Sequence, residues 1–292
     1  MKKKIFLGII LVCYGIGLFL VLTLIRVPLT SVVIYTVNSA LNGRATFSAD
    51  HVELGFPDRL RFEGGVIEVP RGSSTIREEV TKAVLQPEYR SMLQGYLPAR
   101  FSGELSAGRV EGRFGVSRKE GVQDAYLVLH TEGVELSRLE TVSSAFGRKV
   151  KGILNSELEF QGNLENAMQV QGQGQITISN GAIETRVGFP GLETIPFKRV
   201  EVAFSMKDGL VKLDSANMQG SFFTGSLSGT VALRQKLSRS RVSIRGTLSP
   251  GREIRQNPFL GRLLGRALQG ESTIPIQVKG TLERPSIVRE KP

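Results

Sequence analysis

Apolar and polar residues alternate with a period of two through most of the chain between residues 171 and 249. In the run 200–206, for example, Val, Val, Phe and Met are separated by Glu, Ala and Ser, and Asp208-Gly209 then supplies a turn dipeptide. This alternation is typical of strands with one dry and one wet face. The pattern predicts a series of hairpins, with a further turn expected at Asn180-Gly181.

The same alternation extends over residues 45–282, with no break in composition that would mark a second domain. Helical periodicity is confined to short stretches, which we expect at 87–95, 137–146 and 258–270, whereas residues 70–78 are expected to form a loop. The predicted fold class is therefore mainly β. We expect a long, curved, mostly antiparallel sheet with a few short helices.

The N-terminus has the features of a membrane anchor. Three lysines at positions 2–4 precede an uncharged run, 5–25, which as a helix would be about 30 Å long. A cleaved signal peptide is the alternative, but its apolar region is usually only ~7 to 15 residues long and ends at a small-residue site, which is lacking here. We expect a transmembrane anchor at 5–25, with residues 1–4 in the cytoplasm and the rest beyond the membrane.

A second helical stretch is expected at 26–43, with Thr30 or Ser31 as its N-cap. This juxtamembrane helix either lies along the membrane surface or covers one end of the sheet, and the sequence favours neither. Residues 44–284 are expected to form one β-rich domain. A charged, frayed tail is expected at 285–292.

Four short helices are too few to cover the dry face of so long a sheet. The sheet either closes on itself as a sandwich or barrel, or curves into an open trough that holds lipid or a segment of another protein. We favour the trough, because glycines recur on the apolar face at Gly225, Gly229, Gly246 and Gly280, where bulky packing would be absent. The candidate groove residues are Phe204, Phe223, Leu227, Val231, Val242, Ile244 and Leu248.

The formal net charge of +11 indicates an anionic neighbour. The candidates for a basic surface are Arg241, Arg245, Arg262 and Arg266. Nucleic acid would also require stacking aromatics or a groove-entering module, and neither is visible, so no nucleic-acid partner is expected. An anionic membrane surface or an acidic partner protein fits better, and a merely solubilising face is an equal alternative.

Residues suited to catalysis are scarce. The chain has two histidines, His51 and His130, and one cysteine, Cys13, so zinc sites, His-based triads and intramolecular disulfides lack the necessary residues. The run 225–229, Gly-Ser-Leu-Ser-Gly, has Leu where a nucleophile would stand, and Glu157/Glu159 are expected to be solvated. We therefore expect no catalytic residues, no metal, no cofactor and no enzymatic activity.

Several short motifs occur in a characteristic order: Phe-Pro at 56–57 with Leu-Arg-Phe-Glu-Gly-Gly-Val-Ile at 60–67, then 178–183, 208–213, and 225–229 before 246–250. Together with the N-terminal anchor, this ordered set resembles the type II secretion system protein N family. It is also similar to the wider AsmA-like group of inner-membrane-anchored periplasmic proteins. The resemblance covers nearly the whole chain, and its specificity lies in the order of the motifs.

The resemblance implies a single-pass protein of the inner membrane of a Gram-negative envelope, with a β-rich body in the periplasm. It implies an accessory or structural role in type II protein secretion, with the inner membrane and other secretion components as partners. The similarity to AsmA-like proteins implies the alternative, a lipid-binding or lipid-transfer protein of the envelope with phospholipid as its ligand. The family supplies no catalytic residues to assign here.

Overall fold

The computed structural model describes residues 29–41, 43, 45–55, 59–71, 74–88, 96–105, 107–119, 122–163, 166–185, 193–234, 239–256, 273–282 and 284–289. Its strands form one sheet. They are β1 (Thr46–Ser48), β2 (His51–Gly55), β3 (Arg59–Arg71), β4 (Ser74–Pro87), β5 (Tyr96–Leu105), β6 (Gly108–Lys119), β7 (Val122–Glu135), β8 (Val150–Asn163), β9 (Gln171–Glu184), β10 (Thr194–Lys207), β11 (Leu210–Gln219), β12 (Phe223–Ala232), β13 (Arg241–Pro250), β14 (Ile274–Thr281) and β15 (Pro285–Arg289).

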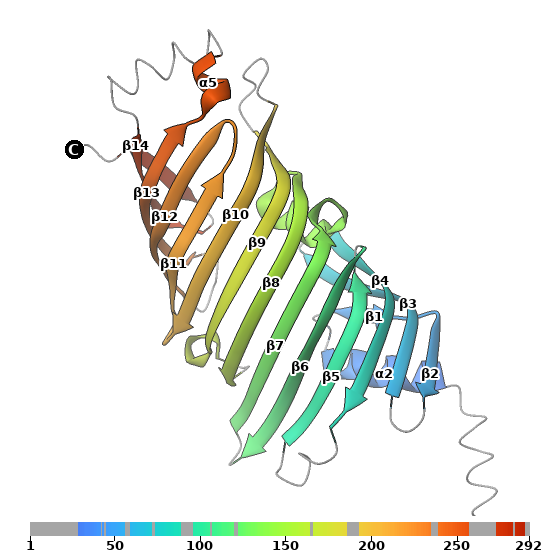
Figure 1. Cartoon of the computed structure of the whole chain (residues 1–292). Coiled ribbons are helices and arrows are strands. Elements are labelled where there is room, and N and C mark those ends of the chain that lie inside the picture. The colour runs from blue at the N-terminus through green and yellow to red at the C-terminus, as the bar shows by residue number, and fades with distance from the viewer. Residues whose placement is uncertain are drawn as a thin grey trace, which may run out of the picture.

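Strand order in the sheet follows the order of the sequence. From β3 to β15 every strand pairs with its neighbours in the chain, always antiparallel, and β1 and β2 both pair with β3. In the described part of the chain β15 does not return to pair with β1, so the sheet is open. Figure 1 shows a long, twisted and curved sheet, which confirms the prediction of a mainly β fold built on a curved antiparallel sheet.

In the described part of the chain, five short helical segments accompany the sheet: α2 (Leu29–Leu41), η1 (Leu136–Arg138), α4 (Glu140–Phe146), η2 (Ala167–Gln169) and α5 (Arg252–Gln256). Within the described ranges, no helix has the length and hydropathy needed to cross a membrane. The expected anchor at 5–25 and the expected helix at 258–270 lie outside the described residues. Most of the stretch 87–95 does too, and its first residue, Pro87, ends β4.

Three sequence-based expectations are wrong in detail. Residues 70–78 belong largely to β3 and β4 rather than to a loop, and β15 occupies most of the tail expected to fray. Asn180-Gly181 does not end a strand, because β9 continues to Glu184. Asn180 has a φ of 50°, and the β8–β9 register shifts opposite it, so the dipeptide forms a bulge.

Helix α2 lies against the first two strands, as expected if the helix at 26–43 covers one end of the sheet. The Asn38 side chain accepts a hydrogen bond from the Phe47 backbone N–H (2.6 Å) and donates one to the Phe47 carbonyl (2.9 Å). Thr30, expected as an N-cap, instead accepts a hydrogen bond from the backbone N–H of Val52 at 3.3 Å. These contacts fix α2 to β1 and β2.

The connection between β7 and β8 folds over one end of the sheet. The expected helix at 137–146 is divided here into η1 and α4, which are separated by Leu139. Val134, Leu136, Leu139 and Val150 are buried together, packed against residues of β5, β6, β8 and β9. We call this end of the strands the helix end, and the opposite end, where the Asp208-Gly209 turn joins β10 to β11, the turn end.

Helix α5 covers the continuation of the helix end (Figure 1). Its Ile254 is 1% exposed and packs against Ile195, Phe222 and Phe223. The hydrophobic core of the described chain is therefore small. It is concentrated under α4 and α5 and beside α2, where Val52 and Phe62 are buried.

Candidate binding face

Alternation of side chains places one continuous set of apolar residues on a single face of the sheet, which we call the apolar face. Across β8, β9 and β10 the register aligns Leu158 with Gly174 and Gly174 with Phe204. Phe204 is opposite Leu213 of β11, and the same alignment continues to β14. Two residues that are directly opposite each other on paired strands lie on the same face of the sheet. The register therefore determines which residues form the apolar face.

The expected groove residues lie on this face. Leu227 is opposite Gly246, Val231 is opposite Val242, and Ile244 is opposite Gly229. Phe204, Leu248 and Phe223 occupy the matching positions of their strands, and Phe223 also packs against Ile254 of α5. Of the seven candidates only Val242 is buried, at 7% exposed, and the others are partly exposed.

Glycines on the apolar face are covered by large side chains from neighbouring strands. A Cβ atom on Gly174 would lie 2.6 Å from Leu158 Cδ2 and 2.7 Å from the Phe204 ring, and one on Gly225 would lie 2.5 Å from Leu248 Cδ2. The expectation that glycines on this face mark positions without bulky packing is therefore wrong at Gly225 and at Gly246, which Leu227 covers, whereas the nearest atoms to Gly229 and Gly280 are backbone atoms. The missing side chains let the neighbouring leucines and phenylalanines lie flat across the sheet.

Phenylalanine rings also lie flat across the strands on this face. The Phe160 and Phe204 rings, from β8 and β10, approach across β9 with their centroids 6.3 Å apart. Phe101 and Phe114 form a second pair, at 6.2 Å. The first pair covers the backbone of β9 and the second lies on the adjacent strands β5 and β6, and these rings form one layer only. Over the middle of the face, no described element packs a second layer on them.

An apolar pocket opens on this face towards the turn end of β6, β7 and β8. Its volume is about 300 Å³, at the lower limit of typical ligand pockets. The side chains that form its wall are apolar: Phe114, Val116, Ala125, Leu127, Phe160 and Val170. The apolar face is thus packed under helices at the helix end and hollowed at the turn end.

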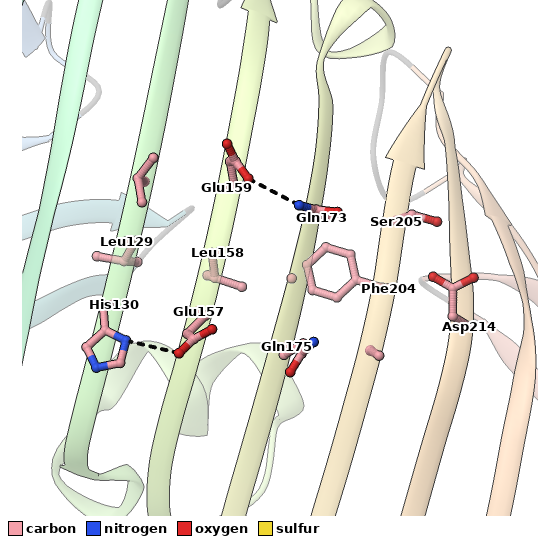
Figure 2. Close-up of a pocket in the computed structure, with 13 residues that line it drawn as sticks. Leu129, His130, Glu157, Leu158, Glu159, Gln173, Gln175, Phe204, Ser205 and Asp214 are labelled. Carbon is pink, nitrogen blue, oxygen red and sulfur yellow. Dashed lines mark hydrogen bonds and ion pairs between the residues drawn. The ribbon is translucent and has the colours of Figure 1, made fainter.

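The opposite face of the sheet is polar. Figure 2 shows an open depression on it across β7–β11, in which His130 points to Glu157 and Glu159 to Gln173. The His130 Nδ1 to Glu157 Oε1 distance is 3.8 Å, and Gln173 donates a hydrogen bond of 3.2 Å to Glu159. The Glu157 side chain is 74% exposed, as expected for a solvated carboxylate.

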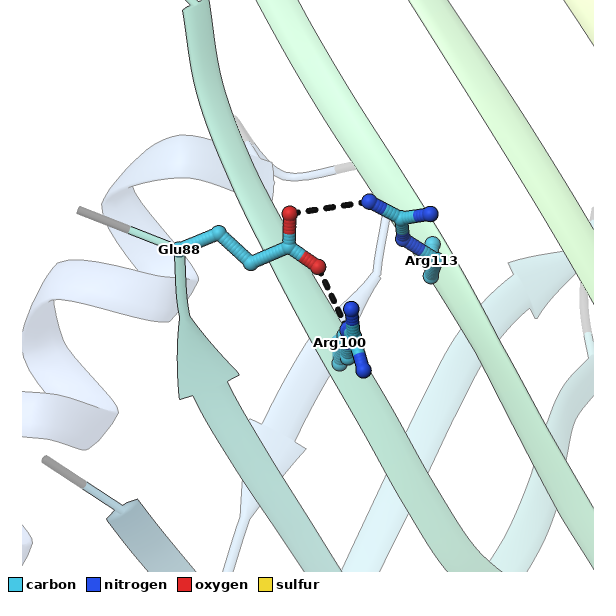
Figure 3. Close-up of polar contacts among 3 residues, drawn as sticks. All are labelled: Glu88, Arg100 and Arg113. Carbon is cyan, nitrogen blue, oxygen red and sulfur yellow. Dashed lines mark hydrogen bonds and ion pairs between the residues drawn. The ribbon is translucent and has the colours of Figure 1, made fainter. Parts of the chain in front are cut away.

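A more tightly bonded group lies where β4 ends, close to the turn end. The Glu88 carboxylate accepts hydrogen bonds from Arg100 Nε at 2.5 Å and Arg113 Nη2 at 2.9 Å (Figure 3). These two bonds, with that from Arg100 the stronger influence, hold the pKa of Glu88 below its ordinary value. Arg100 and Arg113 are directly opposite each other on β5 and β6, so Glu88 offsets a cross-strand repulsion between like charges.

The four expected basic residues do not form one site. Arg241 and Arg245 are exposed on the polar face of β13, whereas Arg262 and Arg266 lie outside the described residues. Arg241 begins β13 at the turn end. Arg234 and Arg239 precede it in the same basic stretch of the sequence. Backbone hydrogen bonds join this connection to two others that are far apart in the chain and carry Lys207 and Arg284.

In the ranges that the structure describes, no group of three or more His, Cys, Asp and Glu side chains is placed to hold a metal ion. The two histidines each approach one glutamate of the polar face, His51 approaching Glu53 at 3.2 Å. Comparison of the chain with protein-family models, with curated proteins and with solved structures gives no match.

Proposed function

We propose that the apolar face binds the acyl chains of phospholipid, and that the protein is a lipid-binding or lipid-transfer protein of the cell envelope. The observation that carries this proposal is the one-layer apolar face. Leu158, Phe160, Phe204, Leu227 and Ile244 remain partly exposed although they belong to the most regular strands of the sheet. Apolar surface on this scale usually marks an interaction site, because burying it is favourable by about 25 cal/mol per Å².

The chemistry of the face favours a hydrocarbon occupant. Backbone N–H and C=O groups of the inner strands are paired with neighbouring strands, and the side chains on this face offer few polar partners. An extended peptide laid on it would bury unpaired backbone groups, each at a cost of about 1–3 kcal/mol. An acyl chain has no such groups.

The predicted amphipathic helix at 258–270 is another possible occupant. As a helix of thirteen residues it would be about 20 Å long. The face from β5 to β14 is about 43 Å wide, because neighbouring strands are about 4.8 Å apart. The helix could cover part of the face, and most of it would remain for a ligand.

An accessory role in type II secretion is a second proposal, based on the ordered motifs. Some of these motifs fall where the backbone is unusual: Gly64 has a φ of 61°, Asn180 of 50°, and Asp208-Gly209 forms a hairpin turn. Such positions are required by the fold, so the motifs support the two proposals equally. A gene located among secretion components would favour this role, and one located beside lipid-synthesis genes would favour lipid binding.

The lipid proposal is tested by purifying the full chain in a mild detergent and identifying co-extracted lipid by mass spectrometry. The wild-type protein should retain phospholipid. Leu227→Glu should lose it, because the charge stands in the middle of the apolar face beside Gly246. Ser226→Glu is the matched control: its neighbouring, exposed position is on the polar face, and its lipid content should equal that of the wild type.

Circular dichroism must show the same strand content in all three proteins. If Leu227→Glu fails to fold, Val231→Gln on the same face provides the test, with the milder change expected to lower the lipid content. Wild-type protein free of lipid, or equal lipid loss in the Ser226 and Leu227 variants, would overturn the proposal.

A further inference from the structure

Three connections meet at the turn end of β10–β14 around one buried serine. Ser240 is fully buried, and its hydroxyl oxygen accepts a hydrogen bond of 3.1 Å from the backbone N–H of Arg234. Its carbonyl oxygen accepts one of 3.0 Å from the N–H of Leu282. The Leu233 N–H donates a hydrogen bond of 2.7 Å to the Gly209 carbonyl. The β10–β11, β12–β13 and β14–β15 connections are thus held side by side.

This arrangement gathers positive charge. Among the described residues, five exposed basic side chains belong to the joined connections or flank them, and we call them the basic cluster: Lys207, Arg234, Arg239, Arg241 and Arg284. In the part of these connections that the structure describes, Asp208 is the one acidic residue. None of the five forms an ion pair with another described residue.

The helix end has a different charge pattern. There the basic residues Arg138, Lys149 and Lys151 are interspersed with glutamates, including Glu140 and Glu184. Arg138 is paired with Glu135 at 2.7 Å. The helix end of β7–β9 thus carries interspersed charges of both signs, in contrast to the turn end of β10–β14.

Apolar side chains are exposed beside the basic cluster. Leu210 is 44% exposed and Leu282 is 49% exposed, and both belong to the connections that Ser240 and Gly209 hold together. Lys207, Leu210 and Arg241 are in register at the ends of β10, β11 and β13 and belong to the polar face. Val242, next to Arg241, is on the apolar face opposite Val231, so the two faces meet at these strand ends. Exposed leucines next to unpaired arginines form a surface suited to the boundary between a lipid headgroup and its hydrocarbon chains.

We infer that the basic cluster binds the anionic phosphate headgroup of a lipid whose acyl chains lie on the apolar face. The inference rests on the proposed function and adds a preference among lipids. Arginine donates paired, charge-assisted hydrogen bonds to phosphate oxygens. Phosphatidylglycerol, which carries a net negative charge, should therefore bind more tightly than phosphatidylcholine, whose choline offsets the phosphate.

The test uses the full chain in a mild detergent, freed of endogenous lipid, and an equimolar mixture of phosphatidylglycerol and phosphatidylcholine with identical acyl chains. Native mass spectrometry then gives the ratio of the two lipids bound. We expect at least about a five-fold preference for phosphatidylglycerol in the wild type. A variant with Arg234, Arg239, Arg241 and Arg284 replaced by Gln should bring this ratio close to one and still bind phosphatidylcholine.

The matched control removes the same charge elsewhere. Arg61, Lys82, Lys151 and Lys198 are exposed basic residues of β3, β4, β8 and the helix-end half of β10, outside the basic cluster, and replacing all four by Gln should leave the preference unchanged. Glycerol 3-phosphate, a headgroup without acyl chains, should not displace phosphatidylglycerol at equal concentration, because the chains supply part of the affinity.

The outcomes separate the two proposals. Equal binding of both lipids by the wild type would overturn the headgroup inference and leave acyl-chain binding intact. Equal loss of preference in both four-residue variants would also overturn it, because net charge alone would then explain the preference. Displacement by glycerol 3-phosphate would show a phosphate site independent of the apolar face. Failure to bind either lipid would contradict the proposed function itself.

Discussion

At the scale of single residues, the sheet is built on repeated contacts between a glycine and a large apolar side chain of the next strand. Leu227 leans over Gly246, Leu248 over Gly225, and Phe160 over Gly172. Each contact hides backbone from water without a second layer of structure. Glycine is the smaller partner in each pair because any Cβ atom would occupy the space of the neighbouring side chain.

We predict that Gly246→Ala destabilises the protein by about 1–3 kcal/mol, the usual cost of overpacking. A Cβ atom there would collide with the Ser226 carbonyl oxygen and with Leu227, and the carbonyl belongs to the paired backbone, so it cannot move freely. Urea unfolding midpoints provide the measurement. Gly55→Ala is the control, since its nearest neighbour would be 3.5 Å away and its stability should be almost unchanged.

A second residue-scale prediction concerns pH. The pKa of Glu88 is lower in the folded chain than its ordinary value of 4.5. The unfolded state therefore binds more protons near that pH, and the stability contributed by Glu88 is present above about pH 4.5 and is lost as pH falls through the lower folded pKa. Glu88→Gln should destabilise the protein by about 0.5–1 kcal/mol at pH 7, the range of exposed ion pairs.

At about pH 3 the gap between wild type and Glu88→Gln should narrow, as judged by unfolding midpoints at the two pH values. Glu79→Gln is the comparison. Its side chain is 77% exposed and 3.9 Å from Arg77, so it should change stability little at either pH. A gap that widened towards acid would contradict the assigned sign of the pKa shift.

At the scale of elements, the sequence predicted the strands better than their connections. Alternation indicated β8, β10, β12 and β13 directly, because each has one face towards water. Residues 70–78 were missed because Glu78 is at a position that alternation would make apolar. Its carboxylate accepts hydrogen bonds from the Thr141 N–H (2.6 Å) and hydroxyl (2.5 Å) of α4, a partner 63 residues away that no local pattern indicates.

The Asn180-Gly181 dipeptide shows a different limit. A positive φ suits both a hairpin turn and a bulge, and only the pairing of β8 with β9 decides between them. The candidate groove residues were predictable because they share the period of their strands. The basic cluster was predictable only in part. Arg234, Arg239 and Arg241 are close in the sequence, whereas Lys207 and Arg284 are 77 positions apart and their connections are joined to this stretch by hydrogen bonds to the carbonyl oxygens of Gly209 and Ser240.

Helix-end packing gives an element-scale prediction. Leu136→Ala should cost about 2–5 kcal/mol, because Leu136 is 3% exposed within the cluster under η1 and α4 and its removal leaves a cavity. Leu210→Ala, at a position that is 44% exposed, should cost much less. Thermal or urea unfolding of both variants measures the difference. Equal costs would mean that η1 and α4 do not protect the sheet as described.

At the scale of the whole molecule, each strand contacts mainly its two neighbours in the sequence. Such a sheet resembles a repeat protein, in which stability is approximately a sum of nearest-neighbour terms. The two wide faces differ in chemistry along its whole length. A ligand that spans several strands on the apolar face therefore contacts a uniform apolar surface. The ends of the strands differ from one another in their charge and in whether a helix packs over them.

The sequence also predicts where this molecule is located. From the lysines at positions 2–4 and the uncharged run 5–25 we expect the sheet to lie beyond the inner membrane. Alkaline phosphatase fused after Pro292 should therefore be active, since the enzyme requires the oxidising periplasm for its disulfides. An inactive fusion, or recovery of the sheet in a soluble periplasmic fraction without residues 1–25, would contradict this topology.

The contact between Asn38 and Phe47 has a consequence for association between molecules. An open sheet exposes peptide groups along its outermost strand, and these can template pairing with another chain. At β1 the carboxamide of Asn38 takes both the donor and the acceptor of Phe47, as the peptide group of an added strand would. Strand addition at β1 is thus opposed by a side chain that imitates the backbone, and an ordered aggregate seeded there would first have to displace α2.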